Sequence, residues 1–385
     1  MDKQGISDKG WRLIFFVFAL CFFYPLWLKA QRSDSLSILF VGDLMQHDAQ
    51  INSARRDGAG YDYSGCYAAV AQEFKQNDVV VGNLEVTLGG KPYRGYPAFS
   101  APDEFLYATR RAGVNVMMTA NNHCLDRGKR GLRRTIALLD SLRIPHAGTY
   151  CNLEERNEKY PLLVEQGNFR IVFLNYTYGT NGIGVNPPNV VNYIDRDLIY
   201  KDIRKARLMR PDVIIACMHW GVEYQHLPRK EEKELAAWMI EQGVNHVIGS
   251  HPHVIQPIVV FPSQRNPADS HLVVYSLGNF ISNMSAPGTD GGLIVQLKLR
   301  KVEGHTYMND CRYAFVWTSR PALSGKSIYK VYPVNVDSNL LNDNEILKRN
   351  HFVKASRQLF KEYTKGINEY FFLKRNRSKS LQIKK

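Results

Sequence analysis

Short apolar runs that each end in polar side chains recur between residues 38 and 248. The runs are continuous rather than alternating, which is typical of strands buried on both faces of a sheet. Stretches with helical periodicity lie between them, and in one of these Leu132, Ile136 and Leu139 fall on a single stripe. This alternation of strands and helices predicts βαβ units and a mostly parallel sheet. The apolar runs are residues 38–41, 78–81, 114–118, 212–216 and 246–248, and the helical stretches are residues 66–75, 102–112, 130–142, 195–208 and 230–242.

A second group of strand-like segments has fewer helical stretches between its members. These segments are rich in β-branched and aromatic residues, as strands are. We expect them to form a second sheet packed on the first, which gives a layered α/β sandwich. They cover residues 161–176, 255–261, 272–280 and 293–299.

The amino terminus carries a separate apolar run. Residues 11–28 are apolar apart from Arg12, and a run of about 17–25 such residues is needed to span a bilayer. Three basic residues, Lys3, Lys9 and Arg12, lie before the run or at its start and two follow it, which weakly favours the amino end inside the cell. We expect residues 1–30 to be an uncleaved transmembrane helix, with a cleaved signal segment as the near alternative and a buried soluble helix as a third. We expect residues 31–36 to be a linker between this segment and the rest of the chain, which would lie outside the cytoplasm.

The net charge of +14 is concentrated at the carboxyl end. Residues 301–385 contain 17 Lys and Arg against 7 Asp and Glu, whereas residues 37–300 contain 28 against 26. The nearly neutral body argues against nucleic-acid binding. We therefore separate residues 301–385 as an extension with a basic tail, in which residues 346–372 have a helical rhythm. The six cysteines show no CxxC spacing and predict neither a thiolate zinc site nor a disulfide framework.

Metal-binding or acid–base side chains follow all five apolar runs. Ligands of open α/β sheets bind beyond the carboxyl ends of the strands. Each side chain alone has an ordinary explanation, such as a helix cap or a solvated turn, but their joint occurrence favours a metal centre. Carboxylate, amide and imidazole groups suit divalent Mn, Zn or Fe, between which the sequence does not distinguish. The residues are Asp43, Glu85, Asn122 with His123, His219, and His251 with His253, the last pair expected on an extended segment that points both imidazoles the same way.

The motifs around these residues resemble the bacterial capsule-synthesis family called CapA or poly-γ-glutamate synthesis (PGA_cap). The resemblance runs through residues 37–300 and implies the calcineurin-like metallophosphoesterase superfamily. That superfamily has an αββα sandwich of two sheets and a centre of two divalent metal ions. The motifs are GDLMQH (42–47), GNLE (82–85), TANNHCLDRG (119–128), MHWGVEY (218–224), GSHPHVIQ (249–256) and YSLGNFISN (275–283).

The resemblance also implies a role for each site residue. Asp43 and His253 would bind the first metal, Glu85 would bridge both, and His123 would protonate the leaving group. Asn122, His219 and His251 would bind the second metal, with Asn121 as a second candidate for the place of Asn122.

One position departs from the superfamily pattern, which has a histidine two residues after the first aspartate. Met45 stands there in this chain. Three outcomes are open: His47 substitutes from the next turn, the first metal is weakly held, or the centre is mononuclear.

Four further residues are candidates for substrate binding or for support of the ligands. Arg94 and Arg127 suit carboxylate or phosphate groups, although solvated loop charges are an equal explanation. Glu223 matches the family motif and is a candidate to orient His219, and Asn279 is a candidate to support the site.

The leading hypothesis is a CapA-like metal-dependent hydrolase or transferase in capsule or poly-γ-glutamate biosynthesis. Metal-activated water would be the nucleophile and His123 the general acid. The protein would sit in the cell membrane as a single-pass protein with its catalytic domain outside the cytoplasm, and an anionic surface polymer or its precursor would be its substrate. The alternative is a non-catalytic, membrane-bound component of a polymer synthesis or export complex with a vestigial metal site.

Overall fold

The structure is a computed structural model that describes residues 34–372 except positions 59, 265, 267 and 268. The predicted membrane segment at residues 1–30 and the basic end after residue 372 lie outside the described residues. Within the described part, no helix has the length and apolar character needed to cross a bilayer.

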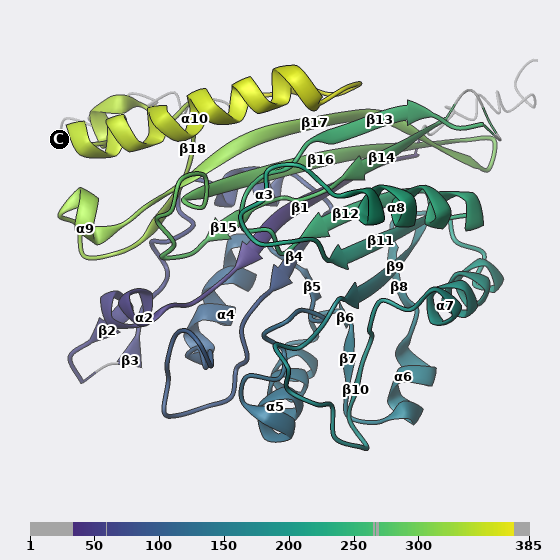
Figure 1. The fold of residues 1–385 in the computed structure, drawn as a ribbon, viewed down its shortest axis with the longest axis horizontal. Coiled ribbons are helices and arrows are strands. Elements are labelled where there is room, and N and C mark those ends of the chain that lie inside the picture. Colours follow the sequence, from purple (N-terminus) through teal and green to yellow (C-terminus); the bar gives the residue numbers. More distant parts are fainter. Residues whose placement is uncertain (1–33, 59, 265, 267–268, 373–385) are drawn as a thin grey trace, which may run out of the picture. The chain divides into compact units, whose positions relative to one another are not determined.

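The larger sheet has nine strands among the described residues, and its centre is parallel (Figure 1). The strands are β1 (Asp34–Leu44), β4 (Val79–Leu84), β5 (Val116–Met118), β6 (His146–Ala147), β15 (Asn279–Ile281), β16 (Gly291–Val302), β17 (His305–Ser319), β18 (Lys330–Pro333) and β19 (Asn368–Glu369). Their order is β18-β17-β16-β1-β4-β5-β6, with β15 beside β1 and β19 beside β17. Strand β16 runs across residue 300, where the sequence analysis places a boundary, so the residues on both sides share one sheet.

The second sheet has six strands in the part of the chain that the structure describes. They are β8 (Leu162–Gln166), β9 (Phe169–Thr177), β11 (Val213–His219), β12 (His246–Ser250), β13 (Ile258–Pro262) and β14 (Ser270–Val274). Their order is β13-β14-β12-β11-β9-β8, and the four inner strands are parallel.

The division of strands between the sheets differs from the predicted one. The expected two-sheet α/β fold is present, but β11 and β12 join the second sheet, and β15 and β16 join the first. The prediction of sheet membership is therefore wrong for these four strands. A run that is apolar on both faces shows that a strand is buried, but it carries no sign of which neighbour the strand pairs with.

The layers follow from the side-chain alternation of β1. Ile38 and Phe40 point into an apolar cluster shared with the second sheet. Leu39 and Val41 point the other way, into a cluster shared with the helices α3 (Ala71–Lys75) and α4 (Asp103–Ala112). The first sheet is thus covered on one face by the second sheet and α10 (Asp343–Tyr363), and on the other by α3 and α4.

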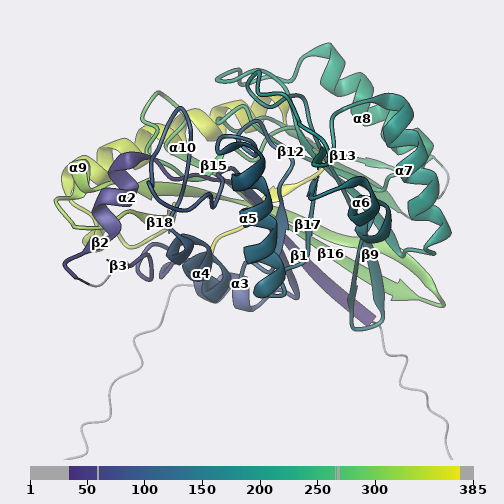
Figure 2. The same ribbon diagram turned by 90° about the horizontal axis from the view of Figure 1, so that it is seen from below.

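The remaining helices lie at the outer faces and edges of the two sheets (Figures 1 and 2). The predicted helices at residues 102–112, 130–142, 195–208 and 230–242 are confirmed within two residues at each end. The predicted helix at residues 346–372 ends early, at Tyr363, and residues 368–369 form β19 instead. The elements are α2 (Asp48–Ala54), α5 (Gly128–Ser141), α6 (Leu153–Lys159), α7 (Arg196–Leu208), α8 (Lys230–Gln242), α9 (Pro321–Ser324), η1 (Ser338–Leu340) and α10 (Asp343–Tyr363), with the short strands β2 (Arg55–Arg56), β3 (Gly60–Tyr61), β7 (Thr149–Tyr150) and β10 (Val190–Val191).

A buried histidine at the start of β12 predicts how stability depends on pH. Burial lowers the pKa of His246 from 6.5 to about 3, and its Nδ1 accepts a hydrogen bond from the amide of Leu272 at 3.2 Å. The unfolded chain therefore binds a proton that the folded chain rejects, so the free energy of unfolding falls as the pH falls from 6.5 through about 3. We expect His246→Asn, which keeps an acceptor but does not titrate, to reduce this slope by up to about 1.4 kcal/mol per pH unit. Urea unfolding of both proteins between pH 4 and pH 7 measures it, and parallel curves would contradict it.

Candidate metal centre

The carboxyl ends of strands from both sheets bring the predicted site residues together. Each of the seven residues exposes 3% or less of its surface, so the group forms a buried polar cluster. Asp43 lies in β1, Glu85 follows β4, Asn122 and His123 follow β5, His219 ends β11, and His251 and His253 follow β12.

Asp43 reaches this cluster because the residue before it is a glycine. A Cβ atom on Gly42 would lie 2.0 Å from the carbonyl oxygen of Gly278. The same oxygen accepts a hydrogen bond from the amide of Asp43 at 3.0 Å. Any side chain at position 42 would therefore push β1 away from the segment that leads into β15.

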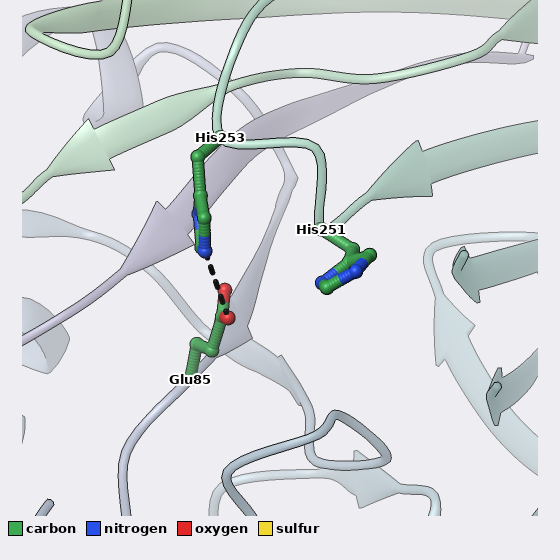
Figure 3. A group of neighbouring side chains, drawn as sticks. All are labelled: Glu85, His251 and His253. Carbon is green, nitrogen blue, oxygen red and sulfur yellow. Dashed lines mark ion pairs between the residues drawn. The ribbon is translucent and has the colours of Figure 1, made fainter. Parts of the chain in front are cut away.

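The segment with His251 and His253 is not extended, and that prediction is wrong. The two residues have positive φ angles of 103° and 58°, a region that is strained for residues other than glycine. Both imidazoles nevertheless lie beside the carboxylate of Glu85 (Figure 3).

Glu85 lies between imidazoles that come from different strands. Its Oε1 is 3.7 Å from Nε2 of His219 and 3.7 Å from Nε2 of His253. This oxygen makes no hydrogen bond to the described residues. Burial, followed by the charge of Asp43, raises the pKa of the Glu85 carboxyl well above its usual value. A buried carboxylate oxygen without a donor is costly, and a cation would remove that cost.

Glu85 also belongs to two sets of donor atoms that each lie within 4.8 Å of one another. One set is Glu85, His251 and His253, and the other is Asp43, Glu85 and His219. Burial lowers the pKa of His251 to about 3 and that of His219 well below its usual value, so both rings are neutral, as metal ligands must be. Nδ1 of His251 makes no hydrogen bond within the described part of the chain. This donor set fits divalent metal ions, and Glu85 is the residue that two ions would share.

Hydrogen bonds show which of the two neighbouring asparagines, Asn121 or Asn122, faces the candidate ligands. Oδ1 of Asn122 is 2.9 Å from Nε2 of His219, which places this amide oxygen in the centre. Asn121 instead donates to the carbonyl of Leu84 at 2.8 Å and accepts from the amide of His123 at 3.2 Å. Asn122 is therefore the asparagine that faces the candidate ligands.

His123 is held by a carboxylate on its own loop. Its Nδ1 is 2.7 Å from Oδ2 of Asp126, and the same oxygen accepts from the amide of Phe99 at 2.8 Å. The Phe99 ring meets the imidazole edge-on at a centroid distance of 4.6 Å. With Nδ1 bonded to Asp126, Nε2 is the nitrogen left to exchange a proton with a substrate.

Met45 and His47 both lie outside the two donor sets. Met45 is buried in the apolar cluster beneath the helices. His47 lies at the start of α2, where its Nδ1 is 3.1 Å from Oε1 of Gln50 and accepts from the amide of Asn283 at 3.3 Å. Burial lowers the pKa of His47. The charges of His253 and His123 also lower this pKa, so His47 lies near the centre, and its role as a ligand stays a prediction.

Comparison with known sequences identifies the family. Residues 37–284 match the family model described as bacterial capsule synthesis protein PGA_cap. The chain belongs to the PGA_cap family. The resemblance seen in the motifs is therefore confirmed.

Two relatives from Bacillus match most of this chain. The capsule biosynthesis protein CapA of Bacillus anthracis is 26% identical over 285 residues, which cover 71% of this chain and 66% of that protein. The PGA biosynthesis protein CapA of Bacillus subtilis (strain 168) is 28% identical over 288 residues, which cover 71% of this chain and 70% of that protein. The match thus spans about two thirds of each relative's length.

The solved structures that match this chain share less sequence identity with it than the two Bacillus relatives do. The NAD nucleotidase NadN of Haemophilus influenzae has a TM-score of 0.47 and 12% identity, over 88% of this chain and 65% of that one. The calcineurin-like phosphoesterase YfkN of Bacillus subtilis has a TM-score of 0.42 and 14% identity, over 86% and 99%. These scores support no conclusion about the reaction.

The other predicted residues of the PGA_cap site take supporting or peripheral places. Oδ1 of Asn279 is 3.1 Å from Nδ1 of His253, and Nδ2 of Asn279 donates to the carbonyl of Thr289 at 2.8 Å. Asn279 therefore fixes the imidazole ring of His253. Glu223 is half-buried and its charge contributes to the raised pKa of Glu85. Arg127 precedes α5 near Asp126. Arg94 is exposed on a neighbouring loop.

Four further residues of the centre were not predicted from the sequence. Asn83 touches Asp43, Asp126 holds His123, and the loop after β9 contributes Tyr178 and Asn181. The spacing of His123 and Asp126, three residues apart in one turn, was a usable signal for that pair. For the β9 loop, the usable signal was the apolar run up to residue 176, which ends in polar residues like the other five.

Removing the charge of Glu85 tests whether it holds metal. We expect Glu85→Gln to lose most of the Mn²⁺ or Zn²⁺ that the wild-type chain keeps after dialysis, because an amide oxygen cannot neutralise two cations. Metal analysis of the dialysed protein measures the loss. Glu232→Gln, which changes a buried carboxylate on α8 outside the centre, is the matched control. Equal metal content in Glu85→Gln and the wild type would contradict the prediction.

Proposed function

We propose that this protein is a metal-dependent hydrolase or transferase that acts on a cell-surface polymer, such as poly-γ-glutamate or capsule material, or on its precursor. The observation that carries the proposal is the unpaired Oε1 of Glu85, set at equal distances from His219 and His253 in a buried site. The names of the Bacillus relatives, which refer to capsule and PGA biosynthesis, support the choice of polymer.

Divalent cations bound by Asp43, Glu85, Asn122 and the three histidines would supply Lewis acidity at the electrophilic centre of the substrate. The chain supplies the proton. Asp126 fixes the ring of His123 through Nδ1, so that a protonated Nε2 can give its proton to the leaving group. Phe99 packs against this ring and helps to exclude water from it.

Substrate would enter past three exposed tyrosines that lie beside imidazoles of the centre. Tyr178 is 4.5 Å from the ring of His251 between centroids. Tyr224 and Tyr96 lie 6.3 Å from His253 and 6.5 Å from His123, respectively. Large exposed aromatic side chains around a polar site are typical of substrate contacts.

The role of His123 predicts a dependence on the leaving group. We expect His123→Gln in the full-length chain to lower kcat by about 10²–10⁴-fold for substrates that leave as an amine or alkoxide. The loss should be much smaller for a para-nitrophenyl phosphoester, whose leaving group needs no proton. Assays on γ-glutamyl and phosphoester substrates with Mn²⁺ measure both, and His271→Gln, on β14 away from the centre, is the control. An equal loss on both kinds of substrate would contradict the acid role.

A non-catalytic role in a polymer synthesis or export complex is the second candidate. The observation that favours it is Met45, whose side chain lies in the apolar core where the superfamily pattern expects a ligand. Protein that keeps two metal ions but turns over neither γ-glutamyl nor phosphoester substrates would favour this non-catalytic role over the hydrolase or transferase.

We also propose that residues 1–30 hold the protein in the cell membrane with its body outside the cytoplasm. The support is the apolar run at residues 11–28. We expect the full-length chain to sediment with membranes and a chain that begins at Gln31 to be soluble, as immunoblots of cell fractions would measure. A mature amino terminus near residue 31 in the wild type would instead identify a cleaved signal segment.

A further inference from the structure

Asn83 is a buried residue in the middle of the centre, and the proposed chemistry gives it no role. Its Nδ2 lies 2.8 Å from Oδ1 of Asp43, 3.3 Å from Oε2 of Glu85 and 3.2 Å from Nδ1 of His219. These three residues form one of the two donor sets. Parallel pairing of β1 with β4 sets Asn83 opposite Asp43, so the contact is built into the sheet.

The orientation of the Asn83 amide is fixed by its neighbour Asn121. Nδ2 of Asn121 donates a hydrogen bond to the carbonyl of Leu84, and Oδ1 of Asn121 accepts one from the amide of His123. Asn121 therefore presents its NH₂ group toward Asn83, 3.3 Å from Oδ1 of Asn83. A flipped Asn83 would set two NH₂ groups against each other. Its own NH₂ must face the carboxylates.

We propose that Asn83 is the positioning residue of the metal centre, which fixes which oxygen of Asp43 and of Glu85 faces the ions. Its NH₂ group engages Oδ1 of Asp43 and Oε2 of Glu85. The two oxygens left over are Oδ2 of Asp43, 3.2 Å from His253, and the unpaired Oε1 of Glu85. The inference rests on the metal dependence in the proposed function.

The neutral amide also sets the charge of the centre and thereby the class of substrate. Two divalent cations would carry four positive charges against two ligand carboxylates, those of Asp43 and Glu85, which leaves an excess of two among the ions and their ligands. Such an excess attracts anionic groups into a buried site. An aspartate at position 83 would add a third carboxylate to the same contacts and reduce the excess by one. Asn83 therefore favours a substrate that brings negative charge to the ions, such as a phosphoryl group or a polymer of carboxylates.

Two substitutions in the full-length chain separate the positioning role from the charge. Asn83→Leu keeps the volume and removes the donor, and we expect Mn²⁺ to bind about 10–100-fold more weakly. Asn83→Asp keeps Mn²⁺ affinity at or above that of the wild type, but inorganic phosphate binds the Mn²⁺-loaded variant more weakly. Equilibrium dialysis with metal analysis gives the first constant, and calorimetric titration of phosphate gives the second. Asn192→Asp, whose side chain accepts from Arg156 outside the donor sets, is the matched control and should keep both constants.

Each outcome decides the inference. A Kd for Mn²⁺ in Asn83→Leu within about twofold of the wild type overturns the positioning role, and unchanged phosphate affinity in Asn83→Asp overturns the charge role. Thermal unfolding of the metal-free variants shows whether they fold, and if Asn83→Leu does not, Asn83→Ser takes its place. A wild type that binds Mn²⁺ and responds to these substitutions without turnover refutes the proposed reaction but not the role of Asn83. A wild type that binds no Mn²⁺ overturns both.

Discussion

The carboxylate of Glu85 meets His219 on one side and His253 on the other, with its Oε1 at 3.7 Å from each Nε2. Neutral imidazoles do not compensate a buried negative charge, and burial alone pushes the carboxyl toward its protonated form. The arrangement is therefore stable in two ways: with a proton on Glu85 or with cations beside it. Two features of the centre meet this constraint: Asn83 donates to the other oxygen of Glu85, and the surrounding imidazoles complete the ligand sets.

The fold meets the constraint by joining two sheets at their carboxyl edges. Strands β1, β4 and β5 deliver the carboxylates, Asn122 and His123 from the first sheet, and β11 and β12 deliver the other histidines from the second. The apolar cluster between the sheets holds the two edges at a fixed separation. Ions bound to residues of both sheets would link the layers, so metal binding and the packing of the sheets stabilise the same state.

Much of this site could be predicted from the sequence, because each strand exit is a local pattern. A continuous apolar run followed by Asp43, Glu85 or His219 is visible within a few residues. What could not be predicted depends on contacts between distant parts of the chain. The contact of Asn83 with His219 joins positions 136 residues apart, and nothing beside Asn83 in the sequence indicates it. Sheet membership failed for the same reason, since β11 and β12 look like β1 and β4 in composition. The positive φ angles of His251 and His253 also depend on tertiary contacts that local preference does not contain.

Met45 occupies a position that the superfamily pattern gives to a histidine, but in this chain that position belongs to the apolar core. Its side chain fills part of the apolar cluster that also holds Leu44 and Phe105. A histidine placed there by a single substitution would bring an imidazole into that cluster without a partner rather than add a ligand to the centre. A ligand at position 45 would therefore require a different course of the chain after Asp43 and not only a different side chain.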